Sequence, residues 1–235
     1  MVFLRSAHIC DLVESKPRGL GPSKLRVKDR GYRTRGRLRG AMGTNRLEAF
    51  SDGVIAVIIT IMVLELKVPQ ATTLDALRPL GITLGSYVLS FLYVGIYWNN
   101  HHHLLHTCEK ATGGILWANL HLLFWLSLIP FAAAWMGQKF TAAAPAALYG
   151  VVLFLAAIAY TILQQQIIAS QPEDSLLKKA IGKDWKGKVS LAMYVVGIWA
   201  AFRAAWISQV LYALTALIWL VPDRRIEKAI VQNEG

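Results

Sequence analysis

Four residues that rarely share a membrane helix stand together at the start of the first apolar segment. Arg46, Glu48, Ser51 and Asp52 directly precede a run of Val, Ile, Leu and Met that ends near Leu64. Polar and ionisable groups are costly in a bilayer, so they are kept mainly where they face protein, water or an ion path. The segment is therefore a candidate binding or pore helix.

One face of this helix carries a single hydroxyl among apolar side chains. At about 100° per residue, Gly53, Val57, Thr60 and Leu64 share that face, with Ile61 at its edge. Ordinary helix packing explains such a stripe, because Val, Ile and Leu at helical spacing usually belong to a core. The functional alternative is a pore built from several copies of the helix, in which apolar rings gate by dewetting and hydroxyls coordinate a cation.

Asp52 lies away from that stripe and needs partners from elsewhere. A helix-end cap or an ion pair with Arg46 is favoured over direct ion binding, since a buried carboxylate without a partner is very costly. His121, in the third apolar segment, is a further candidate partner, and Asn119 in the same segment is a candidate polar partner for other helices. These interpretations give the acidic group a structural role.

A histidine-rich stretch closes the second apolar segment. On a helical wheel Asn99, His102, His103 and His106 share a face, and His102 and His106 have the i, i+4 spacing of a metal pair. A zinc site needs three or four ligands, and His101 points elsewhere, so no metal or cofactor is predicted. The alternatives are polar partners for other helices or a pH sensor, because histidine titrates near neutral pH.

Composition places the chain in a membrane. Of its 235 residues, 55% are hydrophobic and 17% charged, and the mean hydropathy is +0.42. We predict an all-α polytopic membrane protein, because several windows approach the roughly 20 apolar residues that cross a bilayer. The six predicted spans are 47–66, 77–98, 113–136, 142–164, 187–202 and 205–221, the last two forming a short helical hairpin.

Charge sets the predicted orientation and domains. The net charge is +11, and residues 1–46 hold twelve Lys and Arg against three acids. Lys and Arg favour the cytoplasmic side, so we predict a multi-pass protein of the inner or plasma membrane with both termini cytoplasmic, and no nucleic-acid partner. Residues 1–41 read as a disordered basic arm, which is absent if translation starts at Met42; 42–228 form the membrane domain and 229–235 a cytoplasmic tail.

The first apolar segment resembles the signature of the transmembrane protein 175 family, in its bacterial six-helix form. The matching motifs are Arg46-x-x-x-Phe50-Ser51-Asp52-Gly53, Tyr97-Trp98-Asn99-Asn100-His101-His102, Trp117-Ala118-Asn119-Leu120, Leu128-Ile129-Pro130-Phe131 and Trp219-Leu220-Val221-Pro222-Asp223-Arg224-Arg225. The resemblance implies a tetrameric, potassium-permeable cation channel whose first helix lines the pore. K⁺ is then the permeant ion, and the partners are further copies of the chain and the lipid bilayer.

The resemblance also implies roles for residues. Val57, Ile61 and Leu64 match the hydrophobic constriction, with Val57 smaller than the Ile or Leu that is usual there, and Thr60 matches the layer linked to selectivity. The residues that match a network packing the first helix onto its neighbours are Arg46, Phe50, Ser51 and Asp52.

Two other functions compete with the channel. A proton- or metal-coupled secondary transporter would use the histidine cluster, but the inverted repeats and broken helices typical of such proteins are not evident. An enzyme is not predicted, because the sequence contains no nucleophile elbow or phosphate-binding loop.

Overall fold

The computed structural model of the chain describes residues 34–70, 72–108, 110–171 and 185–220. The chain divides into Met1–Thr34 and a unit Arg35–Gly235, and the helices belong to the second unit. α1 (Thr34–Leu64) starts well before the predicted span, within the end of the predicted basic arm. Arg, Leu, Ala and Met favour helix there. Residues 1–33 and 221–235 lie outside the described part. The disorder of residues 1–33 therefore stays a prediction, and so does the cytoplasmic tail 229–235.

The second span is longer than its apolar window. A short 3-10 helix, η1 (Leu74–Leu80), leads into α2 (Gly81–His106), whereas the prediction ended at residue 98. The window ended early because it followed hydropathy alone. The polar residues from Asn99 to His106 stay helical, since several of them bond to neighbouring helices rather than to water.

A proline divides the third span. α3 (Gly113–Ser127) gives way at Leu128 to α4 (Ile129–Gln138), with Pro130 in the first turn of α4. Proline lacks the N–H that the helix interior requires but fits the first turn, where no intrahelical partner is needed. The two helices together form one candidate span, Gly113–Gln138, which agrees with the kink tolerated at this position.

The last helices form the predicted hairpin. α5 (Ala143–Ala169) is the fourth span, and α7 (Trp185–Ala201) and α8 (Ala205–Leu220) follow with 17 and 16 residues. Phe202, Arg203 and Ala204 make the tight turn between them, with hydrogen bonds back to the last turn of α7. α7 and α8 pack against each other, so the hairpin is confirmed.

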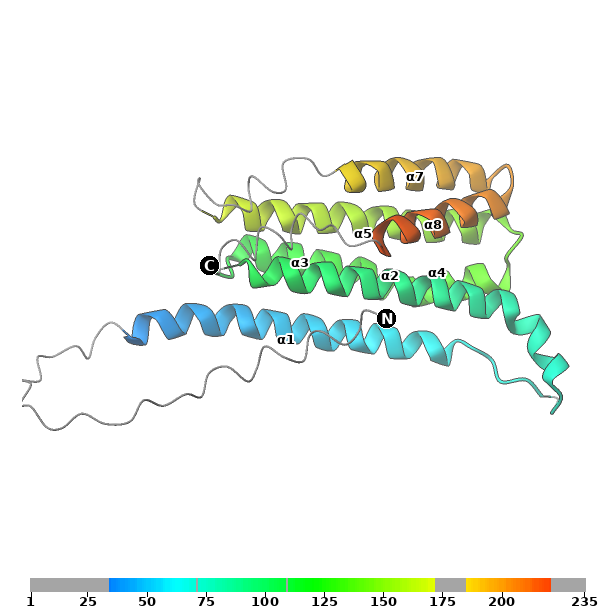
Figure 1. Ribbon diagram of the computed structural model, residues 1–235, viewed down its shortest axis with the longest axis horizontal. Helices are drawn as coiled ribbons and strands as arrows, with labels where there is room; N and C mark the ends of the chain where they lie inside the picture. The colour runs from blue at the N-terminus through cyan, green and yellow to red at the C-terminus, as the bar shows by residue number, and fades with distance from the viewer. Residues whose placement is uncertain (1–33, 71, 109, 172–184, 221–235) are drawn as a thin grey trace, which may run out of the picture. The chain divides into compact units, whose positions relative to one another are not determined.

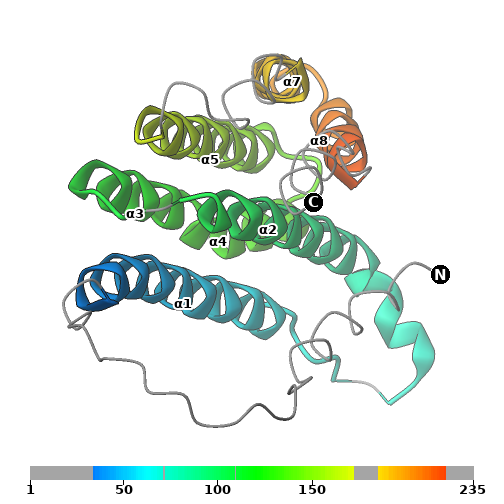
Figure 2. The same ribbon diagram turned by 60° about the vertical axis from the view of Figure 1, so that its left-hand side comes forward.

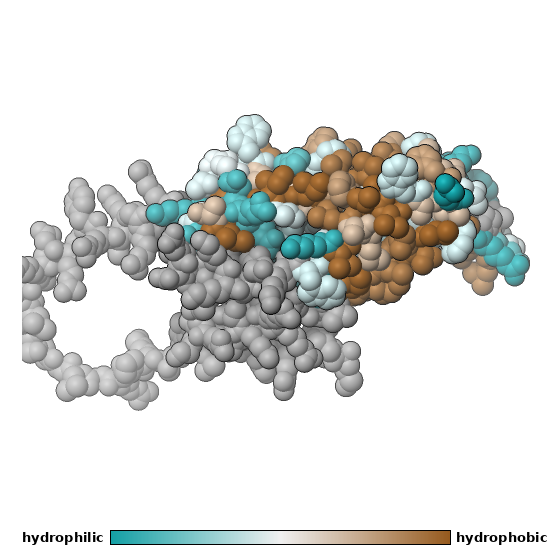
Figure 3. Space-filling model, turned by 90° about the horizontal axis from the view of Figure 1, so that it is seen from above, coloured by the Kyte–Doolittle hydropathy of each residue, from teal (hydrophilic) through white to brown (hydrophobic). Residues whose placement is uncertain are grey.

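Counting α3 and α4 as one span gives six helices among the described residues. Four are long and apolar enough to cross a membrane, and α8 is a shorter apolar helix. Figure 3 shows a largely hydrophobic face with hydrophilic residues toward its two ends. The exposed apolar side chains of the hairpin include Val196, Trp199, Trp206 and Leu217. These features fit a multi-pass membrane protein.

The helices are arranged in layers within this unit. Figures 1 and 2 both place α1 at one side, next to α2, α3 and α4, with α7 on the far side beyond α5 and α8 beside α5. α5 packs against α3, α4, α7 and α8. α1 is thus an outer helix of the subunit, covered on one face only.

Tyrosines fill the centre of the core. Tyr93, Tyr149 and Tyr212 are almost fully buried, and their hydroxyls are satisfied. Tyr93 donates to the Tyr212 carbonyl at 2.7 Å, and Tyr149 pairs with Ser90 at 3.0 Å. Buried hydroxyls are costly unless they are hydrogen-bonded, so these contacts fix α2, α5 and α8 relative to one another.

The beginning of α1 and the ends of α2 and α5 meet at one end of the bundle. Gln171, just after α5, donates to the carbonyl of Thr107, just after α2. His106 of α2 contacts Glu48 of α1. The end of α5 and the end of α2 therefore lie at the same end of the bundle as Glu48 of α1.

Candidate functional site

Ser51 is the buried centre of the polar face of α1. It is 0% exposed, and its hydroxyl donates to the Leu47 carbonyl at 2.8 Å. The same oxygen accepts a hydrogen bond from Nδ2 of Asn119, on α3, at 2.9 Å. A serine on an isolated helix commonly bonds only its own backbone. Here the second bond joins α1 to α3.

His101 completes this chain of hydrogen bonds. It is 0% exposed, and its Nε2 lies 2.7 Å from Oδ1 of Asn119. Because Asn119 donates to Ser51 through its amide nitrogen, its oxygen must accept, so His101 donates from Nε2. Three helices are therefore linked through one asparagine, from α2 through α3 to α1.

The sequence did not identify His101 as a functional residue. On the helical wheel of α2, His101 lies on a different face from the other histidines. The metal-pair spacing pointed to the face with His102 and His106. Its partner lies on α3, so the pairing depends on how α2 and α3 are rotated toward each other. The only available signal was that both residues fall in family motifs.

Asp52 is held by a residue that the sequence did not predict. Its Oδ1 accepts a hydrogen bond from Nε1 of Trp98 at 2.9 Å. Arg46 stands six residues earlier, about 240° around the helix, and among the described residues no ion pair joins them. The prediction of an Arg46 partner was wrong because the two side chains leave α1 in different directions.

His121 is also not a partner of Asp52. It is exposed on α3 and accepts a hydrogen bond from Nε1 of Trp125 at 2.9 Å. It lies two residues beyond Asn119, about 200° around the helix. Since Asn119 faces α1, His121 must face away from it.

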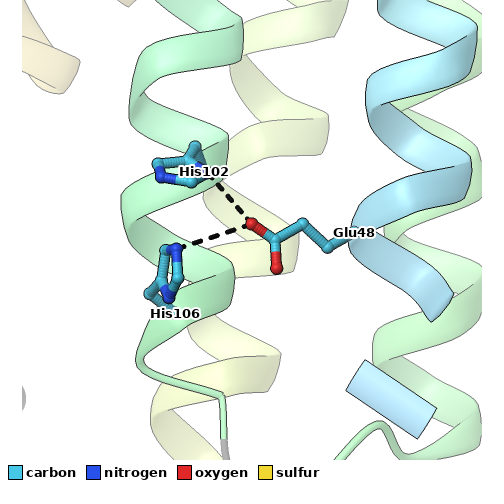
Figure 4. Close-up of side chains that lie close together, drawn as sticks. All are labelled: Glu48, His102 and His106. Atoms are coloured by element: carbon cyan, nitrogen blue, oxygen red, sulfur yellow. Dashed lines mark ion pairs between the residues drawn. The ribbon is translucent and has the colours of Figure 1, made fainter. Parts of the chain in front are cut away.

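Glu48 of α1 lies between two histidines of α2 (Figure 4). Its Oε1 is 3.0 Å from Nδ1 of His102 and 3.5 Å from Nε2 of His106. The sequence paired the histidines correctly but found no third ligand, because it considered α2 alone. Glu48 supplies a third side chain of a kind that can bind a metal, close to both histidines.

The remaining candidate residues are exposed within the subunit. Arg46, Asn99 and His103 are exposed, and Phe50 is 52% exposed. Phe50 was expected to pack the first helix onto its neighbours. It instead lines an open groove of about 610 Å³ between α1 and the junction of α3 with α4, together with Val57, Ile61 and Phe131. Within one subunit, Phe50 is therefore only partly covered by other residues.

The apolar stripe of α1 is uncovered. Val57 is 54% exposed, Ile61 43% and Leu64 80%. Thr60 is exposed as well, and its hydroxyl donates to the Val57 carbonyl at 2.9 Å. The hydroxyl hydrogen is therefore occupied, while the oxygen still has a lone pair that faces outward. Ordinary core packing within the subunit does not account for this stripe.

Comparison with known proteins matches the part of the chain that holds this site to a family. The family described as endosomal/lysosomal potassium channel TMEM175 matches residues 46–130. A potassium channel of Chryseobacterium sp. (strain P1-3) is 54% identical over 192 residues, which are 82% of this chain and 100% of that protein. The human endosomal/lysosomal proton channel TMEM175 is 31% identical over 107 residues, 40% of this chain and 21% of that protein.

A solved structure shares the fold. The crystal structure of a lysosomal potassium-selective channel TMEM175 homologue from Chamaesiphon minutus matches with a TM-score of 0.63 and 24% identity, over 76% of this chain and 96% of that chain. The family match from residue 46 to residue 130 contains Ser51, Asn119 and His101, whose hydrogen bonds link α1, α2 and α3, and the whole apolar stripe.

Proposed function

The chain belongs to the TMEM175 family, and on that premise we propose that it forms a passive, potassium-permeable channel rather than an enzyme. The functional unit is a homotetramer in the inner or plasma membrane, with both termini cytoplasmic. Four copies of α1 surround a common axis and line the pore. The observation that carries this proposal is the apolar stripe of α1, which is exposed on a helix whose opposite face is held by buried hydrogen bonds.

Exposure to lipid alone would not favour a pore, because any membrane helix shows apolar side chains to lipid. The stripe differs from an ordinary lipid-facing surface in the order of its side chains. It runs from Gly53, which has no side chain, through Val57 to the hydroxyl of Thr60 and the apolar Leu64. Such a sequence of small, apolar and hydroxyl layers fits a narrow path in which rings of side chains face each other.

Each layer has a separate role in this proposal. Rings of Val57, Ile61 and Leu64 form the hydrophobic constriction, which stops ions by excluding water. A ring of Thr60 oxygens offers ligands to a partly dehydrated K⁺ and sets selectivity. The polar groups on the other face, Ser51 and Asp52, hold the helix and do not touch the ion.

The orientation rests on charge. Lys and Arg concentrate before α1 and after α5 in the sequence, and Glu48 of α1 lies at the end of the bundle where α2 and α5 end. An even number of spans with that end in the cytoplasm satisfies the positive-inside rule.

Purified full-length protein in liposomes tests the channel directly. With a K⁺ gradient as the only driving force, K⁺ should pass and charge should be carried with it. A second arm with a pH-sensitive dye measures proton passage, because the human relative is named a proton channel. No K⁺ flux, or flux only with a fixed counter-ion ratio, would contradict the proposal. Native mass spectrometry of the same sample checks the tetramer.

The competing function is a coupled transporter that uses the histidines. His102 and His106 contact Glu48, which lies about 90° or more around α1 from Gly53 and Val57. The double substitution of His102→Ala and His106→Ala should therefore leave K⁺ flux in place. Abolished flux in a correctly assembled variant would favour the transporter.

A further inference from the structure

We propose that Glu48, His102 and His106 bind one divalent transition-metal ion of the zinc class in each subunit. The three side chains come from two helices, and one ligand atom of each lies within 4.8 Å of the others. Figure 4 shows the carboxylate of Glu48 directed toward both imidazole rings. Two imidazoles and one carboxylate are a ligand set that zinc takes in proteins, with water in the fourth position.

The distances suit such an ion. Tetrahedral zinc with bonds of about 2.0–2.1 Å places its ligand atoms about 3.3–3.4 Å apart. The Glu48 oxygen lies 3.0 Å from His102 Nδ1 and 3.5 Å from His106 Nε2, on either side of that value. The third pair of ligand atoms, on His102 and His106, lies within 4.8 Å, and rotation of these side chains would bring it toward the same value.

His102 carries a second sign of a ligand site. Its Nδ1 is buried and has no hydrogen-bond partner among the described residues, although Glu48 is 3.0 Å away. The two atoms are therefore close together, but they do not have the angle that a hydrogen bond needs. A metal ion between them would use both lone pairs.

Neighbouring rings hold the site in place. His102 stacks on Trp98 with centroids 5.9 Å apart, and it meets His106 edge-on at 4.4 Å. Trp98 is itself fixed by its hydrogen bond to Asp52. Ligands whose orientation is set by packing and hydrogen bonds bind metal more tightly, because less freedom is lost on binding.

The site is open on one side. The His106 side chain is 60% exposed and that of His102 37%, whereas that of Glu48 is 19% exposed. A hydrated ion can therefore approach past His106 and exchange its water for the sheltered carboxylate. Soft or borderline ions that accept imidazole are favoured here, while Mg²⁺ prefers oxygen ligands and keeps its water.

A bound ion would join α1 to α2 at the end of the bundle where α2 and α5 also end. It adds to the links that Asn119 and Trp98 already make and restricts movement of α1. If α1 lines the pore, as proposed above, the metal changes K⁺ flux. Metal binding itself does not require that the protein conduct K⁺, so the two proposals can fail separately.

Isothermal titration of the full-length protein with Zn²⁺ tests the site. The protein is purified in detergent with its affinity tag removed, so that tag histidines do not bind. We expect one Zn²⁺ per chain, no competition from excess Mg²⁺, and a higher Tm with Zn²⁺, because an ion that binds only the folded state stabilises it.

Two variants locate the ion. His106→Ala and Glu48→Gln should each raise the Kd for Zn²⁺ at least about tenfold, since even outer-shell partners of metal ligands cost that much. His106 is the safer change for folding because it is the most exposed of the three. His121→Ala, an exposed histidine on α3, is the matched control and should bind Zn²⁺ as the parent does.

Two results would overturn the site. One is the absence of saturable Zn²⁺ binding to the parent protein. The other is an unchanged Kd in both His106→Ala and Glu48→Gln, which would assign the bound zinc to other histidines.

Discussion

The two long faces of α1 contrast in burial and in hydrogen bonding. On one face Ser51 is 0% exposed and makes two hydrogen bonds, and on the other Leu64 is 80% exposed. The buried face is mostly apolar, with Leu47, Ile55, Ile58 and Met62 in the core around Ser51. The exposed stripe is also apolar and carries one hydroxyl, and part of it borders the open groove beside α3 and α4.

The difference shows what orients a helix in a membrane. Lipid tails are as apolar as Val or Leu, so apolar burial does little to choose which face of a helix turns inward. Directional hydrogen bonds do choose, because each needs a partner at a set position. The bonds of Ser51 and Asp52 therefore fix the rotation of α1, and the direction of the stripe follows from that rotation.

The largest expected effect comes from breaking the polar face at Asn119. Asn119→Leu leaves the buried Nε2–H of His101 without an acceptor, at a cost of about 1–3 kcal/mol, and removes the bond between α3 and Ser51, which keeps only its bond to the Leu47 carbonyl. The Tm of the purified protein should fall, and less of it should assemble. Thermal unfolding followed by tryptophan fluorescence, with size-exclusion chromatography, measures both.

The matched control is Asn99→Leu, which makes the same change at an exposed asparagine on α2. It should leave the Tm almost unchanged. Equal losses in the two variants would mean that the hydrogen bonds of Asn119 do not hold α1, and the contrast between its faces would then lose its cause.

The next effect belongs to the apolar face. Val57→Asn introduces an amide into the proposed constriction, which keeps water there and raises K⁺ flux several-fold. Flux into liposomes measures it. Val63→Asn is the control, since Val63 is a similarly exposed valine of α1 at 47% but lies about 120° away from Val57 around the helix. Equal flux in the two variants would remove the stripe from the pore.

A smaller and more specific effect is expected at Thr60. Thr60→Ala removes the hydroxyl oxygen from the stripe and should reduce discrimination between K⁺ and Na⁺ with little change in stability. Thr60→Ser keeps the oxygen and should keep the discrimination. Reversal potentials with K⁺ and Na⁺ on opposite sides of the membrane measure both. Unchanged selectivity in Thr60→Ala would leave the hydroxyl with only its helical bond to Val57.

Sequence predicted the features that depend on one helix at a time. Hydropathy identified the six helices, four of which are long and apolar enough to cross a membrane, and the sequence predicted the hairpin of the last two. It also grouped Val57 with Leu64 on one face, which the structure leaves exposed. These properties follow from composition and from the period of a single helix.

Contacts between helices could not be predicted in the same way. Asn119 meets Ser51 and His101, and Glu48 meets His106, only because of how three helices are rotated and shifted against each other. A wheel of one helix contains no such information. It therefore assigned the wrong partners to Asp52 and left Glu48 out of the histidine cluster.

The smallest expected effect tests whether charge matters on the polar face. Asp52→Asn keeps an oxygen that can accept the hydrogen bond of Trp98 and removes only the charge, so it should cost less than about 1 kcal/mol. Asp52→Leu removes the acceptor and should lower the Tm further. Thermal unfolding of both variants gives the comparison.

A loss in Asp52→Asn as large as that in Asn119→Leu would change the interpretation of α1. The carboxylate would then act through its charge, on an ion or on a neighbouring subunit, and not through its bond to Trp98. The polar face would share in conduction, and the division of α1 into one face that holds the helix and one that meets the ion would no longer apply.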